Sequence, residues 1–344
     1  MQDLSLTELL AVFTAAAAII AVCGVRLTGL ADRIADRTGL GEALAGGMLL
    51  GMATSLSGTV VSVTAALDGR ASLAFANAVG GIAAQTMFLA LADLIYRRAN
   101  LEHASAELVN VLQTALLTLM LSLPIVAVAG PDVTVWNIHP VSLALPLIYL
   151  AGARASARTR DAPMWKPVIT HDTRRDRPER DDRDRGRMGI IRLIGGFAVL
   201  ADILGVAGWV ISKAGGQIAD RTDLSQSAVG ALMTAVATSL PELVTTIAAV
   251  RRGALQLAVG GIVGGNTFDV LFLTAADTAY RDGSLYHALT LDDLFWTGTG
   301  LVMVSVLLLG LIIRERRGPV SIGYESLAII LIYVFAVVLQ TSGA

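Results

Sequence analysis

The sequence predicts an all-α polytopic membrane protein with ten transmembrane helices in two inverted five-helix repeats. Three observations predict this fold. The 344 residues are 54% hydrophobic and only 16% charged, whereas soluble domains are about one quarter charged. Apolar segments of about 20 residues, the length that crosses a bilayer, recur along the chain. The chain also matches itself at a fixed offset.

Ten apolar segments are expected to span the membrane. They are residues 6–26, 42–67, 73–96, 106–129, 139–157, 189–212, 227–250, 255–279, 290–313 and 322–341. The first follows an acidic start and is long enough to cross, so no cleaved leader is expected. Cys23 is the only cysteine, which excludes disulfides and thiolate metal sites within one chain.

A polar segment divides the chain into a first membrane repeat (1–157), a charged linker (158–188) and a second membrane repeat (189–344). The linker mixes acids and arginines without apolar periodicity, which is typical of a solvated linker. It lacks the ligand spacing of a calcium loop, and its mixed sign does not favour nucleic acid as a partner. The expected partners are inorganic cations and the lipid bilayer, and the sequence leaves the oligomeric state open.

Arginines gather in alternate loops, which predicts the orientation. One set of loops contains Arg97 and Arg98, the linker, Arg251 and Arg252, whereas the other set contains few basic residues. By the positive-inside rule the first set is cytoplasmic. The linker is then cytoplasmic and both termini are extracytoplasmic, in the inner (cytoplasmic) membrane.

The self-match aligns residues 34–93 with residues 218–277 without a gap, and 23 of the 60 positions are identical. We call the constant spacing between aligned residues the repeat offset. The second copy begins five predicted spans after the first. Because this number is odd, the two copies have opposite orientations in the membrane. Inverted repeats are typical of transporters, with the substrate site at the repeat interface. The matched spans, 42–67 with 73–96 and 227–250 with 255–279, should form the core.

Two carboxylates, Glu242 and Asp269, lie inside apolar segments. A charge there is costly and marks an ion or proton path, although pairing within a helix bundle is the structural alternative. Thr238 and Ser239 precede Glu242 by four and three residues and share its helical face. Pro241 lacks an N–H and should kink the helix. Such an all-oxygen set suits hard cations.

The glycines around residues 260–265 form small-xxx-small pairs, which predict close helix packing. Asn266 precedes Asp269 by three residues and should share its face. For Thr238 and Ser239 alone, hydrogen bonding back to the helix is the alternative to a ligand role.

The segment Ala237-Thr238-Ser239-Leu240-Pro241-Glu242, followed in the next apolar segment by Asp269, resembles the sodium/calcium exchanger family of the cation/calcium antiporters. The resemblance extends over nearly the whole chain. It implies that Glu242, Asp269, Thr238 and Ser239 bind the ions, and that Ca²⁺ moves against Na⁺ or H⁺ by alternating access. The first repeat would add neutral oxygens from Thr54, Ser55 and Gln85. The expected metal ligands are Glu242, Asp269, Thr238 and Thr54.

The first repeat departs from the family pattern. Ser57-Gly58 stands where the family has Pro-Glu. Gln85 stands where the family has an acid or an amide. Fewer charges should weaken Ca²⁺ binding. Asp202, in the middle of a span, is a candidate third acid of the same cavity, or alternatively a partner of a polar group elsewhere in the bundle. Asp93 and Asp277, near span ends, are expected to be solvated.

The function predicted is a secondary cation antiporter that needs no cofactor and is not an enzyme. There is no phosphate-cradling glycine–lysine motif for ATP-driven transport. Two alternatives stay open. A divergent exchanger could have lost Ca²⁺ transport and move a monovalent cation or a proton, or a non-transporting regulator could act through the linker.

Overall fold

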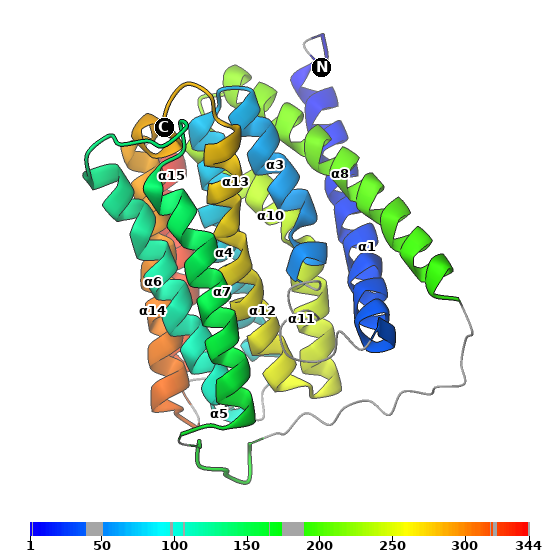
Figure 1. Ribbon diagram of the computed structural model, residues 1–344, viewed down its shortest axis with the longest axis vertical. Helices are drawn as coiled ribbons and strands as arrows, with labels where there is room; N and C mark the ends of the chain where they lie inside the picture. Colours follow the sequence, from blue (N-terminus) through cyan, green and yellow to red (C-terminus); the bar gives the residue numbers. More distant parts are fainter. Residues whose placement is uncertain are drawn as a thin grey trace.

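The chain forms a bundle of helices (Figure 1). The computed structural model describes residues 1, 3–38, 51–96, 99–105, 107–164, 166–173, 189–316, 318 and 322–342, and every regular element in those ranges is a helix. In chain order the elements are α1 (Leu6–Thr38), α3 (Leu56–Leu67), α4 (Ala71–Tyr96), α5 (Leu101–Ala104), α6 (Leu108–Ala129), α7 (Pro140–Asp161), α8 (Ile190–Arg221), α9 (Gln226–Ala228), the π-helix η1 (Val229–Thr234), α10 (Ala235–Thr238), α11 (Leu240–Arg252), α12 (Leu255–Asp269), α13 (Leu271–Ala279), the 3₁₀-helix η2 (Leu285–Ala288), α14 (Leu291–Ile313) and α15 (Tyr324–Ser342).

The all-helical, multi-pass membrane character is confirmed, but the number of ten spans is not. Within the described ranges, eight stretches are long and apolar enough to cross a membrane, or nine if the bent pair Gln226–Thr238 and Leu240–Arg252 is one span. In the predicted span 42–67, residues 51–54 are helical and are followed, after a break at Ser55, by the 12-residue helix α3; residues 42–50 lie outside the described residues. Most of the predicted linker, 174–188, lies outside them as well.

Several helices continue beyond the predicted spans. α1 runs on from residue 26 to Thr38, α7 from 157 to Asp161, and α8 from 212 to Arg221. The added turns carry charged side chains, which an apolar pattern excludes. They still form helix because each added residue gains one backbone hydrogen bond once the helix has started.

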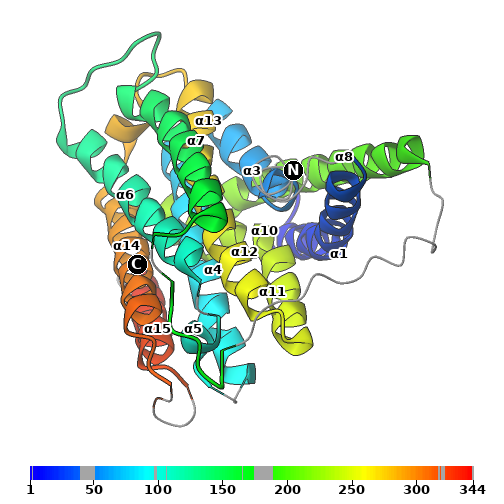
Figure 2. The ribbon, with the colours of Figure 1, turned by 60° about the horizontal axis from the view of Figure 1, so that its bottom comes forward.

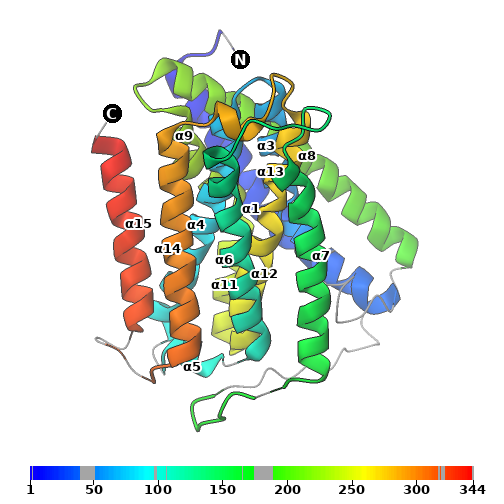
Figure 3. The same cartoon turned by 60° about the vertical axis from the view of Figure 1, so that its left-hand side comes forward.

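Helix α4 is the centre of the bundle. Its apolar residues, which include eight alanines and many large side chains, occur on every side of the helix, which is the pattern of a fully surrounded helix. It contacts α14, α15 and α3 as well as the segment from η1 to α13. Figure 3 shows α15 and α14 along one side of it. Two elements that α4 contacts, α11 and α12, carry the predicted acids.

Helices α1 and α8 form a pair beside the rest of the bundle (Figures 1 and 2). They contact each other along their length. The outer face of α8 exposes large apolar side chains, such as Val199 at 59% and Val206 at 64%, which suits contact with lipid. The inner face packs small residues against α3 and η1.

The predicted kink in the seventh span is confirmed. The helix is broken at Ser239 and bends by 49° between α10 and α11. Pro241 stands in the first turn of α11, where its missing N–H costs nothing. The turn before α10 is the π-helix η1, a form that often occurs at functional sites.

Two acids near span ends are buried rather than solvated, so the expectation of solvation was wrong. Asp93 and Asp277 are both 0% exposed. The Asp93 carboxylate accepts hydrogen bonds from the backbone N–H groups of Leu101 (2.7 Å) and Gly323 (2.9 Å). These bonds replace water and fix the connections between helices.

The same arrangement occurs a second time, at the repeat offset. Asp277 accepts from the N–H groups of Leu285 and His139, each at 2.8 Å. Leu285 is the equivalent of Leu101 at this offset, and His139 is the equivalent of Gly323. Each acid therefore ties a connection in its own half to one in the other half, and the offset governs contacts as well as residue identities.

Candidate cation-binding site

The break at Ser239 turns three polar side chains toward α4 and α12. Glu242 lies in the first turn of α11 and Thr238 ends α10. Glu242 and Thr238 are each 6% exposed and Ser239 is 3% exposed. Because α11 starts here, its free backbone N–H groups favour a negative charge at this position. The break therefore stabilises a carboxylate that a continuous apolar helix would disfavour.

Asp269, at the end of α12, forms the second part of the site. Its carboxylate accepts a short hydrogen bond from the Ser55 hydroxyl and one of 2.7 Å from the Gln85 amide. Gln85 also donates to the Ser239 hydroxyl at 3.2 Å. Ser55, Gln85, Ser239 and Asp269 are thus one buried network, joining the first half of the chain to the second.

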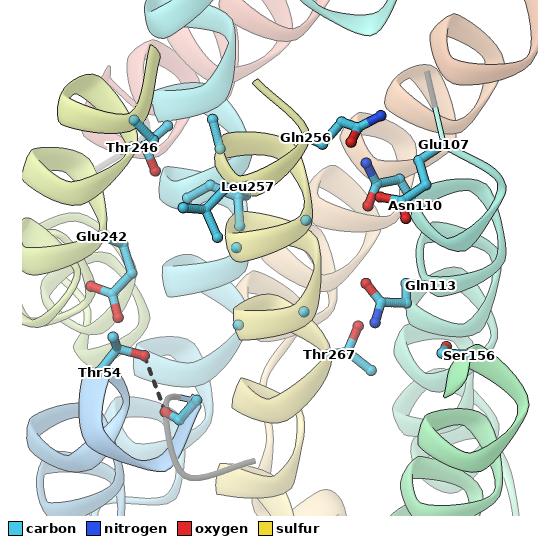
Figure 4. Close-up of a pocket in the computed structure, with 18 of the residues that line it drawn as sticks. Thr54, Glu107, Asn110, Gln113, Ser156, Glu242, Thr246, Gln256, Leu257 and Thr267 are labelled. Carbon is cyan, nitrogen blue, oxygen red and sulfur yellow. Dashed lines mark hydrogen bonds between the residues drawn. The ribbon is translucent and has the colours of Figure 1, made fainter. Parts of the chain in front are cut away.

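A cavity of about 480 Å³ lies beside this network, bordered by Thr54, Glu242 and Gly265 but by none of the four residues of the network itself. Figure 4 shows Glu242 and Thr54 at one wall and polar side chains of α6 opposite. The polar side chains that line it are Thr28, Thr54, Glu107, Asn110, Gln113, Tyr149, Ser156, Arg160, Glu242, Thr245, Thr246, Gln256 and Thr267. The cavity extends to the start of α6 and the end of α7, and so opens at the end of the bundle from which the linker departs.

Buried acceptor oxygens without a partner point to a cation. Glu242 Oε2 and Gln85 Oε1 are both buried and accept no hydrogen bond from the described residues. Leaving such oxygens unsatisfied costs about 1–3 kcal/mol each, which a bound cation would offset. No three His, Cys, Asp or Glu side chains of the described ranges gather around one point. Any cation here would therefore use two carboxylates at most and complete its shell with neutral oxygens.

The two threonines bond within their own helices. Thr238 donates to the carbonyls of Thr234 (2.9 Å) and Ala235 (3.1 Å), as the back-bonding alternative expects. Thr54 donates to the Gly51 carbonyl at 3.1 Å. A hydroxyl that donates in this way still has lone pairs to offer a cation. The Ser239 hydroxyl accepts a hydrogen bond from the Gln85 amide of α4.

At Gly58, where the family has a glutamate, the space for a side chain is taken by an aromatic ring. A Cβ built on Gly58 would lie 2.6 Å from Cε2 of Phe272, so the aromatic ring fills the space that a side chain would need. The equivalent of Phe272 at the repeat offset is also a phenylalanine, Phe88. The site is therefore asymmetric in packing as well as in charge.

Asp202 is not brought to this site. Its side chain is exposed on α8, and it is absent from the lining of the cavity. The buried stripe of α8 contains Leu204, Gly208 and Ile211, and Asp202 lies outside it with exposed Val206. The hypothesis of a third acid in the cavity used only the position of Asp202 near the middle of the span. The buried glycines of α8 mark the face that packs on the bundle, and Asp202 is not on that face.

The glycines of α12 serve the expected close packing only in part: a Cβ on Gly260 would lie 3.1 Å from Oδ1 of Asn110 on α6. Gly260, Gly261, Gly264 and Gly265 line the cavity, and a Cβ on Gly261 would meet nothing within 4 Å. Asn266 faces α4 as Asp269 does, which agrees with the expected shared face, but its amide donates to Thr86 at 3.2 Å and does not join the Asp269 network. The glycines also keep the wall of the cavity open.

Sequence reasoning missed the polar face of α6. Glu107, Asn110 and Gln113 stand three residues apart and all line the cavity. Such spacing places them on one side of the helix, within a segment that is otherwise apolar. That pattern was the available signal.

Comparison with known proteins identifies the family. A family model described as "Sodium/calcium exchanger protein" matches residues 8–152 and 192–342. The chain belongs to this family. The resemblance carried by the Glu242 motif is thereby confirmed, and the unmatched residues 153–191 include the linker. As an exchanger, the chain is a membrane transport protein and not an enzyme.

Two curated relatives of the exchanger are similar in sequence. The inner membrane protein YrbG of Escherichia coli (strain K12) is 26% identical over 303 residues, which cover 86% of this chain and 85% of that protein. The sodium/calcium exchanger MaX1 of Methanosarcina acetivorans is 28% identical over 158 residues, which cover 42% of this chain and 43% of that one.

Two solved structures share the fold. The sodium–calcium exchanger NCX_Mj aligns with a TM-score of 0.60 and 16% identity, over 97% of this chain and 99% of that one. The H⁺/Ca²⁺ exchanger CAX aligns with a TM-score of 0.66 and 11% identity, over 97% and 87%. At such identities the likeness shows the fold alone.

Proposed function

We propose that this exchanger is a secondary antiporter that moves Ca²⁺ against Na⁺ or H⁺ by alternating access. The observation that carries the proposal is Glu242, a buried carboxylate with one oxygen that has no partner among the described residues, in the wall of the cavity. Glu242 is the principal ligand. Asp269 is a second ligand or a proton carrier, and Thr54, Ser55, Thr238, Ser239 and Gln85 supply neutral oxygens.

The architecture we propose is two inverted five-helix halves, residues 1–157 and 189–344, joined by the linker 158–188. Contacts at the repeat offset support it. Gln85 and Asp269 are equivalent at this offset and are hydrogen bonded to each other, as expected for equivalent positions beside a twofold axis. The predicted span 42–67 would then be the tenth crossing. Helices α1 and α8, which stand beside the core, would move against it.

We further propose that the end with the linker faces the cytoplasm, in the inner membrane. The arginine-rich loops support this orientation by the positive-inside rule, and the E. coli relative is named an inner membrane protein. The cavity, which opens at the linker end, would then admit cytoplasmic ions. Both termini would be extracytoplasmic.

A second candidate is exchange of a monovalent cation or proton without Ca²⁺. Two observations favour it. Phe272 fills the place of a first-half acid at Gly58, and both oxygens of Asp269 already accept hydrogen bonds. A site with one available carboxylate suits a single charge better than a double one, because ligand charge tunes Ca²⁺ affinity.

Ion flux into proteoliposomes tests these proposals. Ca²⁺ uptake would be measured under an imposed Na⁺ gradient and, separately, under a pH gradient. Glu242→Gln should reduce the flux at least about 100-fold, because it removes the charge but keeps the shape. Asp202→Asn, the same change on the exposed face of α8, is the control and should leave the flux unchanged.

Each remaining outcome selects an alternative. Flux of Na⁺ or protons with no Ca²⁺ movement would establish the monovalent exchanger. No flux of any cation by a folded wild-type protein would contradict antiport and favour a regulator that acts through the linker.

A further inference from the structure

A second buried polar cluster lies on the side of the core away from the cavity. The amide of Asn77, on α4, donates to the Gly58 carbonyl at 3.1 Å and to the Ser62 hydroxyl at 3.0 Å, both on α3. Its carbonyl oxygen accepts from Thr234 of η1 at 2.8 Å. Ser62 donates in turn to the Ala74 carbonyl at 2.9 Å. One side chain thus joins three elements.

The cluster is fully buried. Asn77 is 1% exposed, and Ser62 and Thr234 are 0% exposed. Every hydrogen-bonding group of the Asn77 amide has a partner, so the cluster is a closed polar network in an apolar surrounding. Such networks are strong when complete, because an unpaired member would be costly.

The position of the cluster relates it to the ion site. Asn77 precedes Gln85 by eight residues on α4, which is about 12 Å along a helix. Thr234 precedes Thr238 by four residues. Both lie toward the end where the α3–α4 turn is found, whereas the cavity lies toward the opposite end, where α5 is found (Figure 1). The cluster therefore stands on the far side of the site.

The repeat offset pairs this cluster with the cavity. Asn77 corresponds to Gly261, and Ser62 corresponds to Thr246. Both Gly261 and Thr246 line the cavity, and a Cβ on Gly261 would meet nothing within 4 Å. Where the second half has open space, the first half has the amide of Asn77 bonded to three partners.

Helix α8 covers the cluster, whereas α1 borders the cavity. A Cβ on Gly215 would lie 2.9 Å from Cγ2 of Thr234, so α8 packs directly on η1. Ser212, on the same side of α8, is 2% exposed. Its counterpart at the repeat offset is Thr28 of α1, which lines the cavity.

From these contacts we infer that Asn77 is the gate of the second ion passage, closed in this structure, on the face opposite the cavity. This inference rests on the proposed antiport. In the alternate state the passage between α3, α4 and η1 opens, and Asn77 exchanges its bonds to Ser62 and Thr234 for water or the passing cation. Asn77 is a positioning residue rather than a ligand of the central site.

Cysteine accessibility tests the inference without any transported ion. In a Cys23→Ala background, Ser212→Cys reports on the passage and Thr28→Cys on the cavity. A membrane-impermeant cationic thiosulfonate is applied separately to each face of vesicles. Thr28→Cys should react from the linker face, and Ser212→Cys should be protected from both faces.

Removal of the gate should expose the reporter. Adding Asn77→Ala should speed the reaction of Ser212→Cys about tenfold, from the face opposite the linker only, since it removes the three hydrogen bonds of the Asn77 amide. Thr234→Val keeps the shape and removes one bond to Asn77, together with the bond of Thr234 to the Gly230 carbonyl in its own helix, and it should speed the reaction by about threefold. It serves as the test if Asn77→Ala does not fold. Asn110→Ala is the matched control, because it removes an equally buried amide (2% exposed) from the cavity wall.

An unchanged rate for Ser212→Cys in both Asn77→Ala and Thr234→Val would overturn the inference. An equal increase in Asn110→Ala would overturn it too, because general loosening would then explain the labelling. Cation flux is measured in the same vesicles. A wild type without flux contradicts the proposed antiport, while the labelling still decides whether Asn77 closes a passage.

Discussion

The two halves of the exchanger share a fold pattern but differ at the positions that matter for charge. Glu242 corresponds to Gly58, and Asp269 corresponds to Gln85. Both acids of the site therefore come from the second half, while the first half supplies an amide and hydroxyls. In the proposed twofold arrangement, two unlike walls meet at the site, and only the wall from the second half carries acids.

The halves also differ in what they leave open. The second half borders the cavity with glycines, and the first half closes the equivalent place with Asn77. If the two halves had identical sequences, opening at one end would cost the same free energy as opening at the other. The small departures from symmetry therefore select which end is open in this structure.

After Glu242→Gln, the largest effect on cation flux is expected from removing the charge of Asp269. We expect Asp269→Asn to lower cation flux by about 10–100-fold, because it removes charge and leaves an amide facing the Gln85 and Ser55 donors. The loss should be smaller than that of Glu242→Gln, since Asp269's oxygens are already hydrogen bonded. Initial rates of uptake measure both, with Asp202→Asn as the control. An effect larger than that of Glu242→Gln would reverse the assigned roles.

Restoring an acid to the first half would sharpen the comparison. Gly58→Glu alone should fold poorly, because its Cβ would meet the Phe272 ring at 2.6 Å. The double variant Gly58→Glu, Phe272→Ala provides space for the carboxylate. It should raise Ca²⁺ affinity about tenfold, since added ligand charge strengthens Ca²⁺ binding. Competition of Ca²⁺ against the flux of a monovalent cation measures this, with Phe272→Ala alone as the control. Equal affinity in the two variants would mean that position 58 does not face the ion.

Much of this site could be predicted from the sequence, because buried charge in an apolar span has few explanations. The pairing of Glu242 with hydroxyls and the bend before Pro241 follow from local spacing and backbone chemistry. The position of Asp202 along its span did not predict which way its side chain faces, because the buried face of a helix depends on the elements that pack against it. Asp93 and Asp277 were misjudged for a related reason. Their partners are backbone N–H groups of distant connections, which no local pattern reveals.

The smallest expected effect is a pH-dependent change in stability at the ends of the bundle, where Glu102 and Tyr286 occupy equivalent positions. Glu102 in α5 is 1% exposed and bonds Ser326 at 3.4 Å through one oxygen, while its other oxygen has no partner among the described residues. At the repeat offset, Tyr286 bonds Ser142 at 3.0 Å. An acid in one half thus stands where the other half has a phenol.

Burial raises the pKa of the Glu102 carboxyl well above its usual range, and the nearby carboxylates of Asp93 and Glu325 raise it further. The folded protein therefore holds this proton to a higher pH than the unfolded chain does. The resulting stability is fully present below the ordinary value of 4.5 and is lost as pH rises through the raised pKa.

Glu102→Gln cannot ionise, so its melting temperature in detergent should exceed that of the wild type at pH 8 and match it near pH 4.5. The difference at pH 8 follows from the raised pKa by linkage, at about 1.4 kcal/mol for each tenfold increase in the proton affinity of the Glu102 carboxyl on folding. Tyr286→Phe is the control at the equivalent position. It loses a hydrogen bond to Ser142 but no titration in this range, so it should lower the melting temperature equally at both pH values. Parallel curves for wild type and Glu102→Gln would show that the charge of Glu102 is already balanced in the fold, and the two ends would then differ in shape alone.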